Sequence, residues 1–217
     1  MKKIIIRNYD DKDKTDFVNF YNFISKKLKA GTVSEEDLKI YFQHPQFDPY
    51  KNMFVVYKEN KLIGYSNIYF DFKNNIRRVE SHLIVHTSYR RKGIGTKLID
   101  TLLNRCNELN IDIVDIFAHK DTKAAREFSK KNKFKIERYF FTTRNKNLKN
   151  IKEIKIPKGI KLDKFSLNGY SIKELVNIEN LTFKDHWEFT KACEDDWNRQ
   201  MKFPFFFRGG NHFCKIG

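Results

Sequence analysis

The stretch that decides the fold runs from residue 85 to residue 98 and reads VHTSYRRKGIGTKL. An apolar strand end is followed by a basic loop with two glycines, and a helical pattern begins directly after them. The first turn of a helix has unpaired N–H groups and a partial positive charge, so the amides of Ile94, Gly95 and Thr96 would hold phosphate well. Glycine at 93 and 95 removes the side chains that would keep a pyrophosphate from the backbone.

Three basic residues precede the glycines. Arg90, Arg91 and Lys92 would add charge-assisted donors around a bound phosphate. A tight strand-to-helix turn with solvated basic side chains is the alternative interpretation. The helix that follows has a clear buried stripe at Leu98, Ile99, Leu102, Leu103 and Cys106.

The remaining pattern predicts alternating strands and helices. Upstream of the loop we expect a strand at 4–8, then a helix from Asp13 to Leu28, then a second helix that is capped by Thr32 and Glu35 and ends at Phe42. A hairpin at 54–57 and 62–72 and a strand at 78–85 should follow. Downstream we expect a strand at 111–118, a helix at 122–131 capped by Asp121, and a last strand at 134–143. This order predicts an α/β fold of the α+β type, with a mixed central sheet flanked by helices.

After this unit the pattern starts again. A charged stretch at 146–158 is a linker candidate between a first domain at 1–145 and a partial second domain at 159–217. In the second part we expect a strand at 160–162, a helix capped by Ser171 and Glu174, and a strand at 212–216. A helical accessory or dimerisation element is the alternative for this tail.

Composition narrows the function classes. The 217 residues include 43 basic and 27 acidic side chains, a net charge of +16. The lysines are spread along the chain, which argues against nucleic acid as a partner and fits either a phosphate-rich ligand or a general lysine bias. The three cysteines form no CxxC pair, and histidines such as His86 and His119 belong to no metal-type cluster, so we expect no metal. The sequence also has no apolar run of membrane length, and we expect a cytoplasmic protein.

The loop resembles the signature of the GNAT superfamily of acyltransferases, Arg/Gln-x-x-Gly-x-Gly/Ala, which Arg90, Gly93 and Gly95 match. Thr87 stands where many members have proline. The resemblance spans about residues 3 to 145 and implies that the loop amides hold the pyrophosphate of coenzyme A. It also implies that the backbone of Leu83, Ile84 and Val85 pairs with the pantetheine arm, where one N–H polarises the thioester carbonyl.

A second family segment matches residues 122–134, with departures. Phe128 is kept, together with Ala125. Thr122 replaces an asparagine that contacts the pantetheine arm, and Ser129 replaces the tyrosine that commonly protonates the departing thiolate. Serine is a much poorer acid than tyrosine.

The resemblance also places a general base on the strand before the loop. Glu80 occupies this position, and His82 shares its strand face. For both, the alternative is a surface residue near the cations Arg77 and Arg78.

The implied function is transfer of an acetyl group from acetyl-CoA, the co-substrate, to a primary amine of a small molecule or peptide in a ternary complex. The alternative is a non-catalytic coenzyme A-binding protein that acts as a sensor or interaction module. Segments 44–49 and 183–190 further resemble tandem members of the mycothiol-synthase type, with the second half incomplete. A homodimer is compatible with either function.

Overall fold

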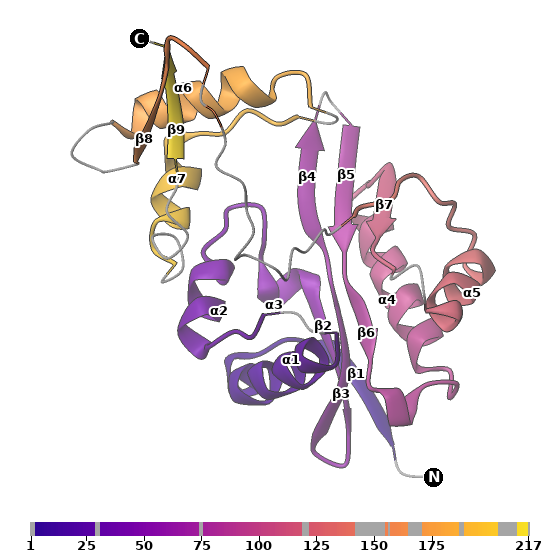
Figure 1. The fold of residues 1–217 in the computed structure, drawn as a ribbon. Helices are drawn as coiled ribbons and strands as arrows, with labels where there is room; N and C mark the ends of the chain where they lie inside the picture. Colours follow the sequence, from indigo (N-terminus) through magenta and orange to yellow (C-terminus); the bar gives the residue numbers. More distant parts are fainter. Residues whose placement is uncertain are drawn as a thin grey trace.

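The structure is a computed structural model that describes residues 3–28, 31–73, 76–118, 122–141, 155, 157–164, 171–186, 189–203 and 212–216. Two β-sheets lie end to end between two layers of helices, and a smaller C-terminal unit lies beside them (Figure 1). The predicted mixed α/β architecture is thereby confirmed for the N-terminal part of the chain.

The first sheet is antiparallel, with the strand order β1-β2-β3-β6. Its strands are β1 (Ile4–Asn8), β2 (Met53–Lys58), β3 (Lys61–Asn67) and β6 (Leu83–Val85). The β2–β3 hairpin turns through Glu59 and Asn60, which have φ values of 53° and 60°. Two successive residues with positive φ match the right-handed twist of the hairpin strands.

The second sheet has the order β4-β5-β7. Its strands are β4 (Tyr69–Lys73), β5 (Ile76–Ser81) and β7 (Ile113–Ile116). Strand β5 is antiparallel to β4 and parallel to β7, so the sheet is mixed.

The two sheets are joined where the predicted strands at 62–72 and 78–85 break, at Ile68 and His82. The reason is local hydrogen bonding at Asn67. Its N–H donates to the carbonyl of His82 (3.2 Å), while its side-chain Oδ1 accepts the N–H of His82 (2.9 Å). A side chain thus replaces one backbone acceptor of the ladder, and each predicted strand becomes two.

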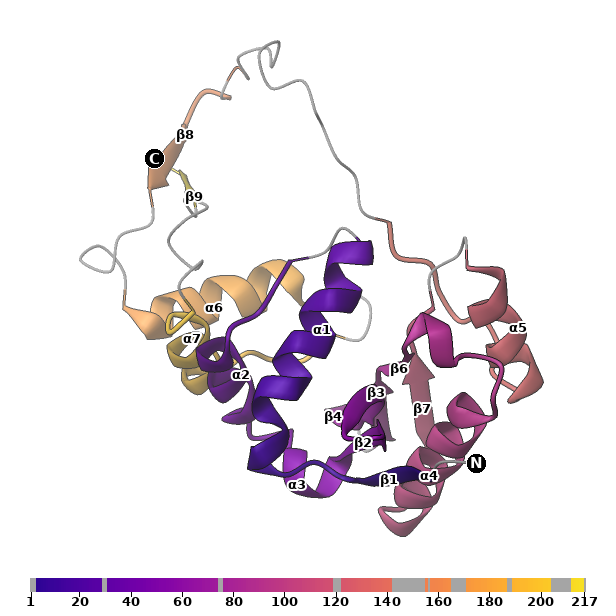
Figure 2. The same ribbon diagram turned by 90° about the horizontal axis from the view of Figure 1, so that it is seen from below.

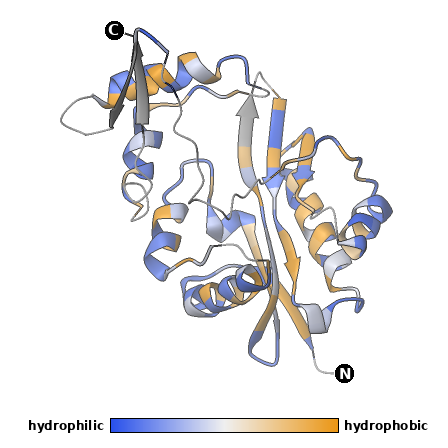
Figure 3. Cartoon of the chain, viewed as in Figure 1, coloured by the Kyte–Doolittle hydropathy of each residue, from blue (hydrophilic) through white to orange (hydrophobic). Residues whose placement is uncertain are grey.

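Helices cover both faces of the sheets (Figure 2). On one face lie α1 (Lys14–Leu28), α2 (Glu35–Phe42) and the short α3 (Pro49–Asn52). On the other lie α4 (Ile94–Glu108) and α5 (Lys123–Lys131). The sheet-facing sides of the helices are apolar (Figure 3). One core cluster joins α1 and α2 to the sheet, and a second joins α4 to its opposite face.

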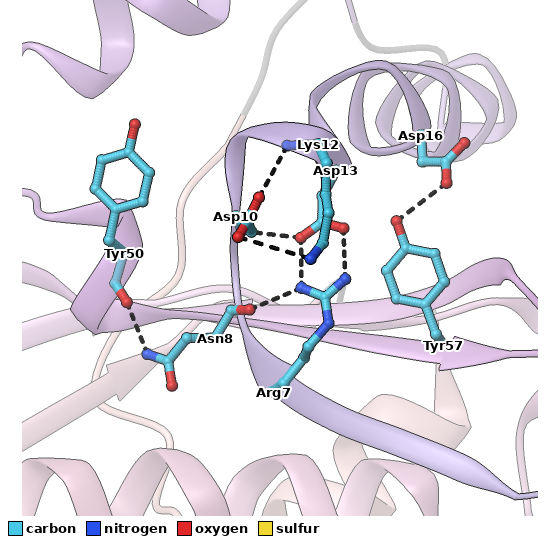
Figure 4. A network of polar contacts seen from close by, with 8 residues as sticks. All are labelled: Arg7, Asn8, Asp10, Lys12, Asp13, Asp16, Tyr50 and Tyr57. Carbon is cyan, nitrogen blue, oxygen red and sulfur yellow. Dashed lines mark hydrogen bonds and ion pairs between the residues drawn. The ribbon is translucent and has the colours of Figure 1, made fainter.

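An ion pair fixes the start of α1 against β1 (Figure 4). Arg7 donates two hydrogen bonds of 2.6 Å to the carboxylate of Asp13, which is 2% exposed. The backbone N–H of Asp10 donates a third, of 2.9 Å, to the same carboxylate. Burial opposes ionisation of Asp13, but these hydrogen bonds prevail and lower its pKa.

Further predicted features differ from the structure. The cap of α2 is a reciprocal box between Ser34 and Asp37, not Thr32 and Glu35, because the helix begins at Glu35 itself. The predicted strand at 134–143 is absent over 134–141, because no strand in the described residues lies beside it to complete a ladder. The remaining two residues of that prediction lie outside the described residues. The helix predicted from residue 122 begins at Lys123, so its N-cap is Thr122 and not the predicted Asp121.

The C-terminal unit contains β8 (Ile160–Lys164), α6 (Ile172–Phe183), α7 (Glu194–Gln200) and β9 (His212–Ile216). The predicted capping box of Ser171 and Glu174 is confirmed. Strands β8 and β9 pair with each other, while α6 and α7 share a small core of Leu175, Val176 and Trp197. Most of the predicted linker lies outside the described residues. Across the described parts of the chain, no helix has the length and apolar character needed to cross a membrane.

Candidate functional site

The glycine loop connects the end of β6 to the start of α4. After a short 3-10 turn at Thr87–Tyr89, Arg91 and Gly93 adopt positive φ values of 61° and 79°. Gly93 is the N-cap of α4 and has no side chain to bond the first-turn amides. The helix therefore presents the N–H groups of 94–96 at the loop, as the sequence predicted.

The loop is accessible to a ligand. Arg90, Arg91, Lys92 and Gly93 are exposed, and a Cβ atom on Gly93 would have no heavy atom within 4 Å. Arg90 also contacts the preceding strand, since its Nε donates a 3.0 Å hydrogen bond to the carbonyl of Val85. This bond ties the loop back to the strand.

Gly95 has a packing role that the sequence did not reveal. A Cβ atom at this position would lie 3.2 Å from Cε2 of Phe128, on α5. The glycine therefore lets α5 approach the first turn of α4, and Phe128 contacts the helix start as part of its packing.

Strand β6 exposes one edge of its backbone. Hydrogen bonds to β3 are made at His82, whose carbonyl accepts from Asn67, and at His86, whose N–H donates to Ile63 (2.8 Å). Because these groups alternate along a strand, Ile84 also faces β3, and Leu83 and Val85 direct their N–H groups to the other side. Strand β6 ends its sheet, and β7 pairs with β5, so this edge faces the split between the two sheets.

Glu80 lies two residues before the break, on the opposite face of the sheet from α4. Its neighbour Val79 belongs to the α4 core, so Glu80 faces the side of α1 and α2. In the ladder Glu80 is opposite Tyr69. Burial, with the nearby charges of Tyr21 and Glu80, raises the pKa of Tyr41 to about 12.

An aromatic cluster lies on the same side of the sheet as Glu80. The rings of Tyr41 and Tyr69 lie 6.1 Å apart, and His44 lies 4.6 Å from Tyr69. Helix α7 lies next to α2 in both views of the fold (Figures 1 and 2). Desolvation, and then the charge of Arg199 on α7, lower the pKa of His44 to about 4. Sequence reasoning missed these rings because strand pairing places Tyr69 opposite Glu80, and packing of α2 on the sheet brings Tyr41 and His44 to Tyr69.

The two polar positions of α5 differ in their bonding. Thr122 is the N-cap of α5 but makes no side-chain cap hydrogen bond, so its hydroxyl is not used in capping. Ser129 donates a 2.9 Å hydrogen bond to the carbonyl of Ala125, one turn earlier in the helix. No cluster of three or more His, Cys, Asp or Glu side chains that could hold a metal occurs among the described residues.

The sheet splits beside a glycine-rich loop at a helix start, and helices cover both of its faces. The chain belongs to the acetyltransferase (GNAT) family, whose sequence profile matches residues 17–134. No curated protein matches the chain.

Solved structures share this fold. An aminoglycoside acetyltransferase from an uncultured soil metagenomic sample, solved with sisomicin, is 20% identical, with a TM-score of 0.52 over 65% of this chain and 97% of its own. A Clostridium acetobutylicum protein described as a predicted acetyltransferase, solved with acetyl-CoA, is 20% identical, with a TM-score of 0.54 over 65% and 96%. Glucosamine-6-phosphate N-acetyltransferase from Arabidopsis thaliana is 16% identical, with a TM-score of 0.52 over 66% and 99%. At these identities the likeness establishes the fold.

Proposed function

We propose that this protein transfers the acetyl group of acetyl-CoA to a primary amine of a small molecule or peptide, by direct attack in a ternary complex. The observation that carries the proposal is that two groups of backbone donors follow one another in the chain, separated only by the glycine loop. The outward backbone edge of Leu83 and Val85 leads directly into the exposed loop and the uncapped start of α4. A ligand with a peptide-like arm and a pyrophosphate matches this sequence of donors.

The residues fit acetyl-CoA on chemical grounds. The amides of Ile94, Gly95 and Thr96 and the side chains of Arg91 and Lys92 would hold the pyrophosphate. The N–H of Val85 would bond the pantetheine arm, and the N–H of Leu83 remains for the thioester carbonyl at the end of that arm, while Ile84 supports the strand through its bonds to β3. Thr122, with a hydroxyl not engaged in capping, would contact the same arm, and Phe128 would brace the first turn of α4.

Acyl transfer then needs a neutral amine and a stabilised oxyanion. Glu80 would take a proton from the bound ammonium, directly or through water, and the amine nitrogen would attack the thioester carbonyl carbon. The N–H of Leu83, at the break in the sheet, would donate to the developing oxyanion. The tetrahedral adduct then loses its second nitrogen proton to water as the carbon–sulfur bond breaks, which leaves the amide, and the coenzyme A thiolate takes a proton from water. Ser129 would not supply this proton, because its hydroxyl is bonded to Ala125.

The test exploits Gly93, where an added side chain meets open space. Asparagine and aspartate both tolerate its left-handed φ and have the same shape. Gly93→Asp places a carboxylate against the pyrophosphate and should weaken acetyl-CoA binding roughly tenfold or more, whereas Gly93→Asn should change it by less than about threefold. Calorimetric titration measures both. Equal affinities for acetyl-CoA in the two variants would refute the assigned site.

The bonding of Ser129 also favours a second candidate, a coenzyme A-binding protein without turnover. Thiol release from acetyl-CoA in the presence of an amine panel separates the two functions. The panel starts with aminoglycosides and glucosamine 6-phosphate, the amines in the names of the structural neighbours, and continues to peptide N-termini. Release with any amine supports the enzyme, and tight binding with no release across the panel supports the second candidate.

A further inference from the structure

His86 connects the end of β6 to the glycine loop through three hydrogen bonds. Its N–H donates to Ile63 on β3 (2.8 Å), and its carbonyl accepts the N–H of Tyr89 (2.9 Å). Its ring atom Nδ1 accepts the N–H of Ser88 (3.2 Å), so the side chain caps the short 3-10 turn from which the loop continues.

The imidazole ring is also held by α1, on the far face of the sheet from α4. The rings of His86 and Phe23 stack with centroids 4.9 Å apart and planes 7° apart. Tyr89 meets the imidazole edge-on at 5.5 Å. One turn after Phe23, Lys27 lies over the Phe23 ring at 4.3 Å, and its Nζ is 3.5 Å from Oγ1 of Thr87. The C-terminal end of α1 therefore contacts the cap residue His86 and the first residue of the turn, Thr87.

The surroundings of His86 keep its ring neutral. Desolvation, followed by the charges of Lys61, Lys27 and Arg90, lowers its pKa below the ordinary histidine value. A neutral imidazole can accept at Nδ1, whereas the imidazolium has no free acceptor. The cap on Ser88 is thus stable at neutral pH, in a region where cations gather.

We propose that His86 is a positioning residue for the cofactor loop: by capping Ser88 and stacking on Phe23, it lets α1 hold the loop in its phosphate-binding shape. This inference rests on the proposed function for its ligand, acetyl-CoA. It also gives α1, which packs on the Glu80 side of the sheet, a direct contact with the loop on the cofactor side.

The experiment uses His44 as a matched control. The Nδ1 atom of His44 accepts the N–H of Gln46 (3.1 Å), the same bond two residues along the chain, away from the glycine loop. His86→Ala removes cap and stack, and His86→Asn restores an acceptor for the cap. We measure acetyl-CoA affinity by calorimetry, amide exchange at 88–93 in the unliganded protein, and thermal stability for these variants and for His44→Ala.

His86→Ala should weaken acetyl-CoA binding about fivefold, because this factor corresponds to the free energy that an N-cap side chain typically contributes. It should also speed amide exchange at 88–93. His86→Asn should recover affinity to within about twofold, and His44→Ala should bind like the parent protein. If His86→Ala lowers thermal stability too far for titration, Phe23→Leu, which removes only the stack, should still speed loop exchange.

Two results would overturn the inference: parent-like affinity and loop exchange in His86→Ala, or equal weakening by His44→Ala. Absence of acetyl-CoA binding by the parent protein would instead reject the proposed function, and the exchange measurements would still decide whether His86 positions the loop.

Discussion

A Cβ atom on Gly95 would lie 3.2 Å from Cε2 of Phe128, so the first turn of α4 and the middle of α5 are in direct contact. The contact lies beside the amides that we assign to the pyrophosphate. Packing between the two helices and presentation of the phosphate site therefore depend on the same glycine.

Branched side chains at position 95 should separate these helices. Gly95→Val should lower the free energy of unfolding by about 1–3 kcal/mol, because its methyl groups displace the Phe128 ring. Gly95→Ala should fall within about 1 kcal/mol of the parent protein, since the gain in helix propensity offsets a small shift of the ring. Urea unfolding measures both, and adding Phe128→Leu should recover part of the loss in Gly95→Val. No recovery would mean that the valine acts elsewhere.

The Arg7–Asp13 pair should contribute strongly to stability. Asp13→Asn should cost about 2 kcal/mol, because it leaves the Arg7 guanidinium without its charged partner beside a buried site. Asp16→Asn is the control, since this exposed carboxylate accepts from the hydroxyl of Tyr57 (3.0 Å) and the change should cost less than about 0.5 kcal/mol. Urea unfolding measures both variants. Similar losses of unfolding free energy in Asp13→Asn and Asp16→Asn would contradict the idea that burial makes the Asp13 pair important.

Stability should fall as the solution is acidified because of His44. Its pKa is about 4 in the folded protein, below the ordinary value of about 6.5, so the unfolded chain takes up the proton first. The stabilisation is therefore complete above about pH 6.5 and is lost as pH falls towards about 4. His44→Asn keeps an acceptor for Gln46 without titrating, so its unfolding free energy should depend less on pH over this range. Identical slopes for the two proteins would rule out His44 as a source.

Removal of the candidate base should slow acetyl transfer without weakening acetyl-CoA binding. With an amine that the parent protein acetylates, Glu80→Gln should reduce kcat/KM for the amine about a hundredfold near neutral pH. The loss should shrink at high pH, where the free amine needs no base. A pH-independent loss would indicate that Glu80 orients the amine and does not take its proton.

Ser129 should be dispensable for the chemistry. Its hydroxyl is bonded to the carbonyl of Ala125, so Ser129→Ala should change kcat by less than about twofold. Steady-state kinetics with the same amine measure this. A tenfold or larger drop in kcat would return Ser129 to the role of proton donor.

Several elements could be predicted because their signals are local. The strand Ile4–Asn8, the capping box of Ser171 and Glu174, and the helix after the glycine loop follow from residues close together in the chain. The prediction of a phosphate site in the loop has an equally local basis, since it depends on two glycines, three basic residues and a helix start. These features need only propensity, periodicity and hydrogen bonds within one turn.

Tertiary structure decided the rest, because the relevant contacts join distant parts of the chain. The break at His82 depends on the side chain of Asn67, and the approach of Phe128 to Gly95 joins two helices. The unpaired segment 134–141 has an alternating sequence but lacks a neighbouring strand among the described residues. The sequence alone predicts a phosphate site at Arg90–Gly95, because its signal lies within one loop and one helix start. Which backbone groups of β6 point away from β3, and which residue lies opposite Glu80, depend on strand register, a property of paired strands.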